Sequence, residues 1–407
     1  MFGMSLSMGI LSLLIAFITP AFSYDYGIDR ISEPAFEAQL QNRNIAVLAH
    51  AASVDRNGSH LIDLLNRRFS LKKIFVPEHG LRSLNDGWVK DGVDDQTGLP
   101  VFSLYKERTR APNPADLKDI DLVIIDLQDV GVRYYTYFST IAEFIKVAAS
   151  LQKEVMILDR PNPLGGLKVE GETLDAALEG AFISYFTVPT RHGLTLGELA
   201  RFYVEEKKIP AKLTIIPVKD WHREPVIAHS DRPWKPSSPA ILTREQVFLY
   251  ALWGSLEHFN LSVGRGQTNE LAFKVIAAPW ISVAESQVLA TELNAMGFKG
   301  LTFLPHSFTA SRDVYLGQRV NGVLIELSEG YEELRTDEVT FAISSFLSSR
   351  YSETLKFSKF AVNYYGSERF LNSIRNASPW SEVTIQLDDR ISSFLKRSQP
   401  YLLYSVF

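Results

Sequence analysis

The residues best suited to chemistry follow a short apolar segment at residues 73–76. Glu78, His79 and Arg82 come directly after it. A carboxyl group beside an imidazole suits acid–base chemistry, since each group influences the protonation of the other, and a guanidinium adds a binding group for an anion. Glu78 is therefore our first candidate for a catalytic residue. The alternative is a structural glutamate that accepts hydrogen bonds from backbone N–H groups at the start of a helix.

Polar segments also follow three other apolar segments. His50 follows residues 45–49, the segment 128–135 follows residues 122–127, and the segment 159–166 follows residues 155–158. Ligands of open parallel sheets bind beyond the carboxyl ends of the strands. We therefore expect these four loops to meet around one site.

The elements that would position these loops alternate along the chain. Apolar, β-branched segments predict strands at 45–49, 73–76, 122–127, 155–158 and 213–218. Amphipathic patterns predict helices at 61–69, 138–151 and 196–206, the last with a capping box of Thr195 and Glu198. Alternating strands and helices predict an α/β fold, a Rossmann-like, mainly parallel sheet with helices on both faces.

A second, smaller domain is expected after residue 235. Residues 219–240 are rich in tryptophan and proline, as is typical of an irregular junction. The patterns beyond it predict helices at 244–253, 283–296 and 339–350, and strands at 271–277, 302–304 and 322–327. We therefore divide the chain into a Rossmann-like catalytic domain (24–235) and an auxiliary α/β or α+β domain (236–407).

Residues 1–23 have the pattern of a secretory signal peptide. An apolar run at 10–18 precedes Pro20 and a small-x-small site at 21–23, and no later stretch approaches membrane length. An uncleaved anchor is the alternative, because the segment carries no Lys or Arg before the apolar run. Cleavage would release a periplasmic or secreted bacterial protein with no membrane contact. The absence of cysteine fits a periplasm better than a eukaryotic exterior.

Composition excludes several classes of function. The 407-residue chain is 46% hydrophobic and 22% charged, which is typical of a globular protein, and its net charge of −5 argues against a nucleic-acid partner. The lack of cysteine excludes disulfides, thiol catalysis and Fe–S clusters. Motifs for nucleotide, dinucleotide and zinc-protease chemistry are absent, so we expect no cofactor and no metal. A metal site of Asp126, Asp129 and Asp159 is the open alternative.

Six segments together resemble the bacterial exo-β-N-acetylmuramidase family. They are 77–82 (PEHGLR), 128–137 (QDVGVRYYTY), 158–166 (LDRPNPLGG), 169–171 (VEG), 191–193 (RHG) and 260–266 (NLSVGRG). The resemblance runs from about residue 42 to the C-terminus. It implies a Rossmann-like domain that holds the active cleft, an auxiliary C-terminal domain, and release of N-acetylmuramic acid from non-reducing ends of peptidoglycan fragments.

The resemblance implies catalytic roles for a small set of residues. The family's proposed catalytic glutamate corresponds to Glu78, with His79 beside it. Glycoside hydrolysis normally uses two carboxyl groups, and Asp129 and Glu170 are the candidates for the second. Asp129 could instead cap a turn, Glu170 could pair with Arg191, and the substrate's acetamido group could replace a second carboxylate. The sequence leaves open whether hydrolysis retains or inverts the configuration at the anomeric carbon.

The same resemblance implies a set of substrate-binding residues. Muramic acid carries a lactyl carboxylate, for which arginine is the best partner, and the candidates are Arg82, Arg133 and Arg191. Tyr135, together with Tyr134, Tyr137 and Trp88, could stack on sugar rings, and His192 could bind a hydroxyl. Asn260 and Arg265 from the second domain are further candidates. His50 is a candidate because it follows the first strand, where many members of the family have Asn instead. The alternative for each is a structural hydrogen bond or ion pair.

Two rival functions stay open at this point. Two α/β domains around a cleft behind a signal peptide also describe a non-catalytic periplasmic receptor for sugars or muropeptides. The second rival function is that of a metal-dependent esterase or amidase. Peptidoglycan fragments are the expected partner in the favoured interpretation, and the oligomeric state is left open.

Overall fold

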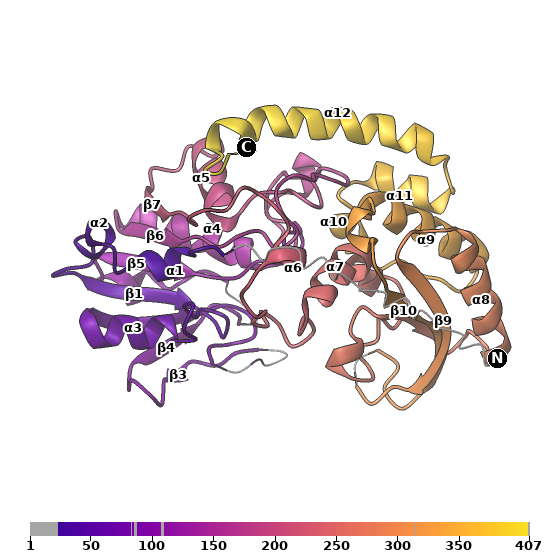
Figure 1. The fold of residues 1–407 in the computed structure, drawn as a ribbon, viewed down its shortest axis with the longest axis horizontal. Coiled ribbons are helices and arrows are strands. Elements are labelled where there is room, and N and C mark those ends of the chain that lie inside the picture. Colours follow the sequence, from indigo (N-terminus) through magenta and orange to yellow (C-terminus); the bar gives the residue numbers. More distant parts are fainter. Residues whose placement is uncertain (1–22, 83, 85–87, 107–109, 313, 406–407) are drawn as a thin grey trace, which may run out of the picture.

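The first part of the chain forms a seven-stranded sheet (Figure 1). The computed structural model describes residues 23–405, apart from 83, 85–87, 107–109 and 313. The strand order is β3-β4-β2-β1-β5-β6-β7, and all pairs are parallel except β3 with β4. The strands are β1 (Asn44–Ala49), β2 (Ser70–Val76), β3 (Gly92–Val93), β4 (Pro100–Ser103), β5 (Leu122–Asp126), β6 (Glu154–Leu158) and β7 (Lys212–Ile216).

Helices cover both faces of this sheet because successive residues of β1 point to opposite sides. Ile45 and Val47 pack with α3 (Leu61–Arg68) and α1 (Gly27–Arg30), whereas Ala46 and Leu48 belong to the core that holds α4 (Tyr137–Ser150) and α5 (Leu196–Glu206). The capping box at the start of α5 is present, since Thr195 Oγ1 accepts a hydrogen bond from Glu198 N at 3.1 Å. The predicted Rossmann-like class is confirmed. Two further short helices are α2 (Pro34–Glu37) and α6 (Val226–His229).

The second part is built around a three-stranded antiparallel sheet of order β8-β10-β9. Its strands are β8 (Val275–Ala278), β9 (Leu301–Thr309) and β10 (Arg319–Leu327). Its helices are α7 (Arg244–Trp253), α8 (Val283–Ala295), α9 (Thr336–Arg350), α10 (Ala361–Tyr365) and α11 (Glu368–Arg375). The smaller mixed domain is therefore as predicted. The strand predicted from residue 271 begins only at Val275, because a 3-10 turn (Asn269–Leu271) precedes it.

The last helix, α12 (Trp380–Ser398), returns the chain from the second sheet to the first (Figure 1). Arg397 pairs with Glu206 on α5, and the Tyr404 hydroxyl reaches Asp159 beyond β6. The sequence analysis did not foresee this return, and the boundary after residue 235 stays a prediction. None of the helices in the described ranges combines the length and apolarity that crossing a membrane needs. The predicted signal peptide lies outside the described residues, apart from Ser23.

Candidate functional site

A cavity of about 380 Å³ lies where loops of the two sheets meet. Loops that follow β2, β4 and β5 supply Glu78, Tyr105 and Thr136, and the second part of the chain supplies Glu257 and Arg265. The other lining residues are mostly aromatic or apolar: His79, Arg110, Tyr134, Tyr135, Phe182, Ile183, Ser238, Ala240, Ile241, Tyr250, Phe273 and Tyr364. A polar centre with aromatic walls is a composition suited to a sugar ring.

Glu78 is held in this cavity by hydroxyl groups. Its Oε2 accepts a hydrogen bond from Thr136 Oγ1 at 2.9 Å, and its backbone carbonyl accepts one from the Tyr137 hydroxyl at 3.4 Å. Burial, together with the charge and hydrogen bond of Glu78, raises the pKa of Tyr105. Tyr105 therefore stays protonated and can donate to the Glu78 carboxylate. These contacts fix a half-buried carboxyl group at the cavity wall.

The turn after Glu78 requires unusual backbone angles. His79 has a φ of 74° and Gly80 a φ of 87°, both in the left-handed region. A histidine seldom adopts this conformation, whereas glycine does so without a steric penalty. The chain therefore turns sharply directly after Glu78, and both Glu78 and His79 line the cavity.

A second carboxyl group comes from a residue that the sequence analysis missed. Glu257 lies on a 3-10 helix (Gly254–His258) after α7, and its Oε1 accepts a hydrogen bond from Arg265 Nη1 at 2.8 Å. Both side chains line the same cavity as Glu78. The apolar strand pattern that flagged Glu78 has no counterpart before Glu257, so only proximity to the predicted Arg265 segment could have indicated it.

Arg110 is a further cation of the cavity that the sequence analysis missed. Its guanidinium lies 4.3 Å from the ring centroid of Tyr105, 4.8 Å from that of Trp88 and 5.0 Å from that of Phe182. Cation–π contacts of this kind hold a guanidinium in place at the cavity wall.

The tyrosine walls are fixed by hydrogen bonds behind the rings. The Tyr135 hydroxyl donates to Ser237 Oγ at 2.9 Å, and the Tyr134 hydroxyl donates to the Tyr250 carbonyl at 2.9 Å. Tyr134 also stacks on Tyr364, with ring centroids 4.8 Å apart. Tyr134 and Tyr135, both predicted to contact sugar, therefore line the cavity. Tyr137 does not line it, and its hydroxyl donates to the Ser237 carbonyl at 2.5 Å.

Asp129 and His192 lie together in a small closed pocket outside the cavity. His192 Nε2 is 3.8 Å from Asp129 Oδ2. Burial raises the pKa of Asp129 to about 7 and lowers that of His192 to about 3. His192 is therefore neutral near pH 7, and Asp129 is about half protonated there. Asp129 also accepts a hydrogen bond from Gly131 N at 2.9 Å, as a turn-capping carboxylate does.

Glu170 and Arg191 form a buried ion pair between the two parts of the chain. Glu170 Oε2 lies 3.3 Å from Arg191 Nη1 and accepts hydrogen bonds from the backbone N and the hydroxyl of Thr336 at 3.0 and 2.7 Å. Thr336 begins α9 in the second part of the chain. Neither charged residue lines the cavity. The two form the structural ion pair that the sequence analysis gave as the alternative to a role in the site.

The other predicted arginines and Asn260 also have internal partners. Arg133 Nη1 donates to the carbonyls of Glu172 and Val188 at 2.6 and 2.9 Å, and burial lowers its pKa to about 10. Arg82 lies between the carboxylates of Asp63 and Asp94, at 2.6 and 2.7 Å. The Asn260 side chain bonds to backbone groups of Thr354 and Lys356. None of these three residues lines the cavity.

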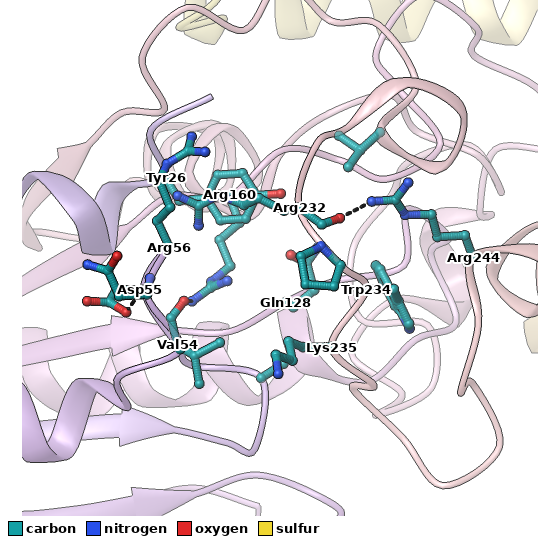
Figure 2. Close-up of a pocket in the computed structure, with 15 residues that line it drawn as sticks. Tyr26, Val54, Asp55, Arg56, Gln128, Arg160, Arg232, Trp234, Lys235 and Arg244 are labelled. Atoms are coloured by element: carbon teal, nitrogen blue, oxygen red, sulfur yellow. Dashed lines mark hydrogen bonds between the residues drawn. The ribbon is translucent and has the colours of Figure 1, made fainter. Parts of the chain in front are cut away.

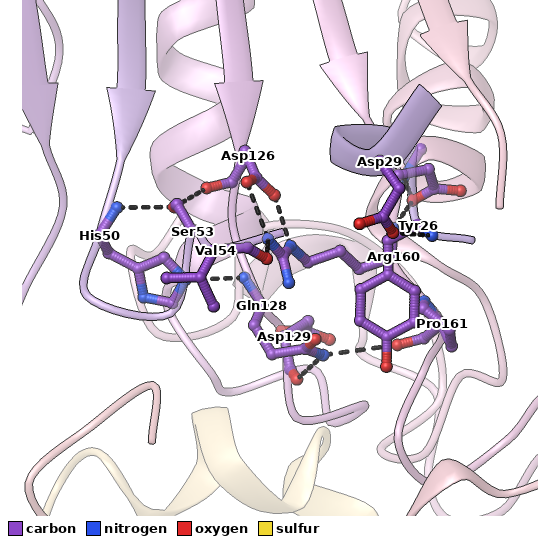
Figure 3. Close-up of polar contacts among 12 residues, drawn as sticks. Tyr26, Asp29, His50, Ser53, Val54, Asp126, Gln128, Asp129, Arg160 and Pro161 are labelled. Atoms are coloured by element: carbon purple, nitrogen blue, oxygen red, sulfur yellow. Dashed lines mark hydrogen bonds and ion pairs between the residues drawn. The ribbon is translucent and has the colours of Figure 1, made fainter. Parts of the chain in front are cut away.

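His50 supports the loop after β5 instead of facing the cavity (Figure 3). Its Nε2 accepts a hydrogen bond from Gln128 N at 3.0 Å, so the ring proton resides on Nδ1, which lies 3.2 Å from the Tyr137 hydroxyl oxygen. Burial lowers the pKa of His50 well below its ordinary value. His50 thereby links the loop after β1 to Tyr137, which in turn contacts the backbone of Glu78.

The three aspartates considered for a metal site have separate partners. Asp126 pairs with the Arg160 guanidinium (Figure 3), and Asp159 Oδ2 accepts a hydrogen bond from Thr195 Oγ1 at 2.6 Å. Within the described part of the chain, no group of three or more His, Asp or Glu side chains is arranged to hold a metal ion.

Comparisons with known proteins agree on one family. A family model described as "Exo-beta-N-acetylmuramidase NamZ, N-terminal" matches residues 45–245, and its C-terminal counterpart matches residues 248–404. The chain is 32% identical over 390 residues to the peptidoglycan beta-N-acetylmuramidase NamZ of Bacillus subtilis (strain 168), with 93% of this chain and 91% of the relative covered.

Two solved structures have the same fold. Both are DUF1343 family proteins from Bacteroides fragilis NCTC 9343, with TM-scores of 0.82 and 0.76 and identities of 30% and 26%. Each covers 94% of this chain and 99% of its own. The likeness therefore includes both sheets and the helices around them.

Proposed function

We infer that this chain, which belongs to the exo-β-N-acetylmuramidase family, hydrolyses the bond that joins a non-reducing terminal N-acetylmuramic acid to the rest of a peptidoglycan fragment. The family resemblance found in the sequence motifs is confirmed. The observation that carries the proposal is the Glu78 carboxyl group, held by hydroxyl donors in a cavity that also contains Glu257.

We assign the two carboxyl groups of the reaction to Glu78 and Glu257. Glycoside hydrolases place one carboxyl group to protonate the leaving oxygen and another to attack the sugar or to activate water. Glu78 and Glu257 come from opposite parts of the chain and line the same cavity, whereas Asp129 and Glu170 do not. A hydroxyl donor fixes the orientation of Glu78, and the Arg265 guanidinium fixes that of Glu257, so both carboxyl groups are held in place for the reaction.

Recognition of the lactyl carboxylate falls to the arginines of the cavity. Arg110 and Arg265 line it, whereas Arg82, Arg133 and Arg191 lie outside it. A planar guanidinium binds a carboxylate through two parallel hydrogen bonds. A neutral glucosamine has no carboxylate and could not accept this pair of bonds. The tyrosine rings would then pack on the apolar face of the sugar.

The test is consumption of a defined substrate. The purified protein is incubated with a disaccharide whose non-reducing residue is N-acetylmuramic acid, and products are followed by mass spectrometry. We expect free N-acetylmuramic acid, and much slower release of sugar from the matched disaccharide that ends in N-acetylglucosamine. A protein that binds the disaccharide stoichiometrically and returns it unchanged would be a receptor. Activity that a chelator abolishes would indicate a metal-dependent hydrolase.

We also propose that the protein acts outside the cytoplasm. The uncharged apolar run at 10–18 and the small-x-small site at 21–23 support export, and peptidoglycan lies on that side of the bacterial membrane. N-terminal sequencing of protein from a bacterial host should give a chain that starts at Tyr24. A chain that still begins at residue 1 and is recovered in the membrane fraction would indicate an uncleaved anchor.

A further inference from the structure

A second cavity of about 260 Å³ lies at the carboxyl ends of β1, β5 and β6 (Figure 2). The loop after β1 forms one wall with Val54, Asp55 and Arg56, and the segment 232–235 forms the other. None of its lining residues lines the catalytic cavity. Strand order reverses between β1 and β5, and this reversal is where open α/β sheets bind their ligands.

The charges that face this cavity are mostly positive. Five cationic side chains line it, against the single carboxylate of Asp55: Arg56, Arg160, Arg232, Lys235 and Arg244. Carboxylates outside the cavity lining neutralise three of them, since Arg56 pairs with Asp231 and Asp25, Arg160 with Asp126 and Arg232 with Asp29. These ion pairs hold the guanidinium groups in position.

The remaining positive charge lies on one side of the cavity. Arg244 donates to the backbone carbonyls of Ser230 and Arg232, which carry no net charge, and Lys235 is exposed at the rim. Among the residues that the structure describes, no carboxylate lies within ion-pair distance of Arg244 or Lys235. The positive charges of Lys235 and Arg244 exceed the negative charge of Asp55 by a small amount. Such a small excess of positive charge suits a monoanion such as a carboxylate better than a phosphate dianion.

Two further features indicate that the cavity is built for a ligand. Arg232 is about nine-tenths buried, and its guanidinium lies 3.9 Å from the ring centroid of Tyr26, so these two lining residues hold each other in place. The Trp234 ring also lines the cavity and is fixed by a hydrogen bond from its Nε1 to the Ile241 carbonyl at 3.2 Å. An indole held in this way is a stacking surface for a sugar ring.

We propose that this second cavity is a non-catalytic binding site for a carboxylate-bearing monosaccharide. The cations Lys235 and Arg244 bind the carboxylate, and Trp234 packs on the sugar face. The volume suits one sugar residue. N-acetylmuramic acid is the natural probe, and this choice rests on the proposed function, because that function releases the same sugar.

The test is calorimetric titration of a Glu78→Gln protein, which prevents turnover. We expect N-acetylmuramic acid to bind at two sites, and Lys235→Glu in the same background to weaken one of them by at least about tenfold. Trp234→Ala should weaken the same site. Lys72→Glu is the matched control, since Lys72 is exposed near the amino end of β2, and it should leave both sites unchanged.

Ligand controls and activity separate the outcomes. Neutral N-acetylglucosamine should not fill the second site, and inorganic phosphate should bind there more weakly than N-acetylmuramic acid. Lys235→Glu in the otherwise native protein should retain turnover within about twofold. No effect of Lys235→Glu on any binding site, or tighter binding of phosphate, would overturn the inference. A protein that binds two sugars but hydrolyses nothing would contradict the proposed function and would leave the proposed second binding site supported.

Discussion

In the catalytic cavity, Glu257 and Arg265 form an ion pair whose side chains are 21% and 32% exposed. Between the two parts of the chain, Glu170 and Arg191 form a pair whose side chains are 6% and 3% exposed. The residue types are the same, but the cavity pair keeps polar surface for a ligand, whereas the buried pair uses its hydrogen bonds within the protein. A charged residue can therefore serve either chemistry or architecture, and its exposure decides which.

The largest expected effect is a loss of activity on substitution in the cavity, which distinguishes the cavity from the buried ion pair. Glu78→Gln should lower kcat for a chromogenic N-acetylmuramide by about 10³-fold or more, because the amide cannot transfer a proton or attack the sugar. Thermal unfolding of the variant should match that of the native protein within a few degrees. A folded variant with near-normal kcat would remove Glu78 from the reaction.

The next effect concerns the pH dependence of stability. Folded Asp129 loses its proton around its raised pKa of about 7, whereas the unfolded chain releases it near the ordinary pKa of 3.8. Between these pH values the folded state binds more protons than the unfolded state. The contribution of this residue to the free energy of unfolding therefore falls as pH rises. Its contribution is fully present below about pH 4 and is lost as pH passes 7.

Asp129→Asn should remove that pH dependence. Urea unfolding should show the variant gaining stability relative to the native protein by roughly 3 to 4 kcal/mol between pH 4 and pH 8. Activity near pH 7 should change little, because Asp129 lies outside the cavity. A variant with native stability at every pH and no activity would instead place Asp129 in catalysis.

A smaller loss of stability is expected from Glu170→Gln. The change leaves the Arg191 charge buried without its carboxylate and should cost about 3 kcal/mol in urea unfolding. Specific activity of the folded fraction should remain within a few-fold of native. If activity falls about 100-fold while stability is unchanged, Glu170 belongs to the reaction and the contrast with the cavity fails.

The smallest effect concerns selectivity within the cavity. Arg265→Ala should raise KM for an N-acetylmuramide about tenfold and leave KM for the matched N-acetylglucosaminide unchanged, because only the former has a lactyl carboxylate. Steady-state kinetics on both substrates measure this. Arg82→Ala is the control, since Arg82 lies outside the cavity, and it should not alter selectivity. Equal losses on both substrates would show that Arg265 does not recognise the lactyl group.

Much of the fold was predictable because its signals are local. The five predicted strands of the parallel sheet fall within three residues of β1, β2, β5, β6 and β7, and the helix predicted at 196–206 coincides with α5. Strands β3 and β4 were missed, since β3 is only two residues long and β4 begins at a proline. Helices α10, α11 and α12 were also missed, and α12 matters because it returns the chain to the first sheet.

The site was only partly predictable. Of the twelve residues selected from the sequence, Glu78, His79, Tyr135 and Arg265 line the cavity. The others have partners inside the protein and lie outside the cavity, as Arg133 does although it is next to Tyr134 and Tyr135. Glu257 and Arg110 were missed because neither follows a predicted strand of the parallel sheet.

The amino-acid sequence by itself determined the alternation of strands and helices, the loops at the carboxyl edge of the sheet and the family. These follow from hydrophobic periodicity and from contiguous motifs, both of which are local. The tertiary structure alone decided which charged groups meet a ligand. Glu170 is buried because Thr336, 166 residues away, donates to it, and Glu257 enters the cavity because the second domain packs against the first. Burial and partnership depend on such distant contacts, so no local pattern specifies them.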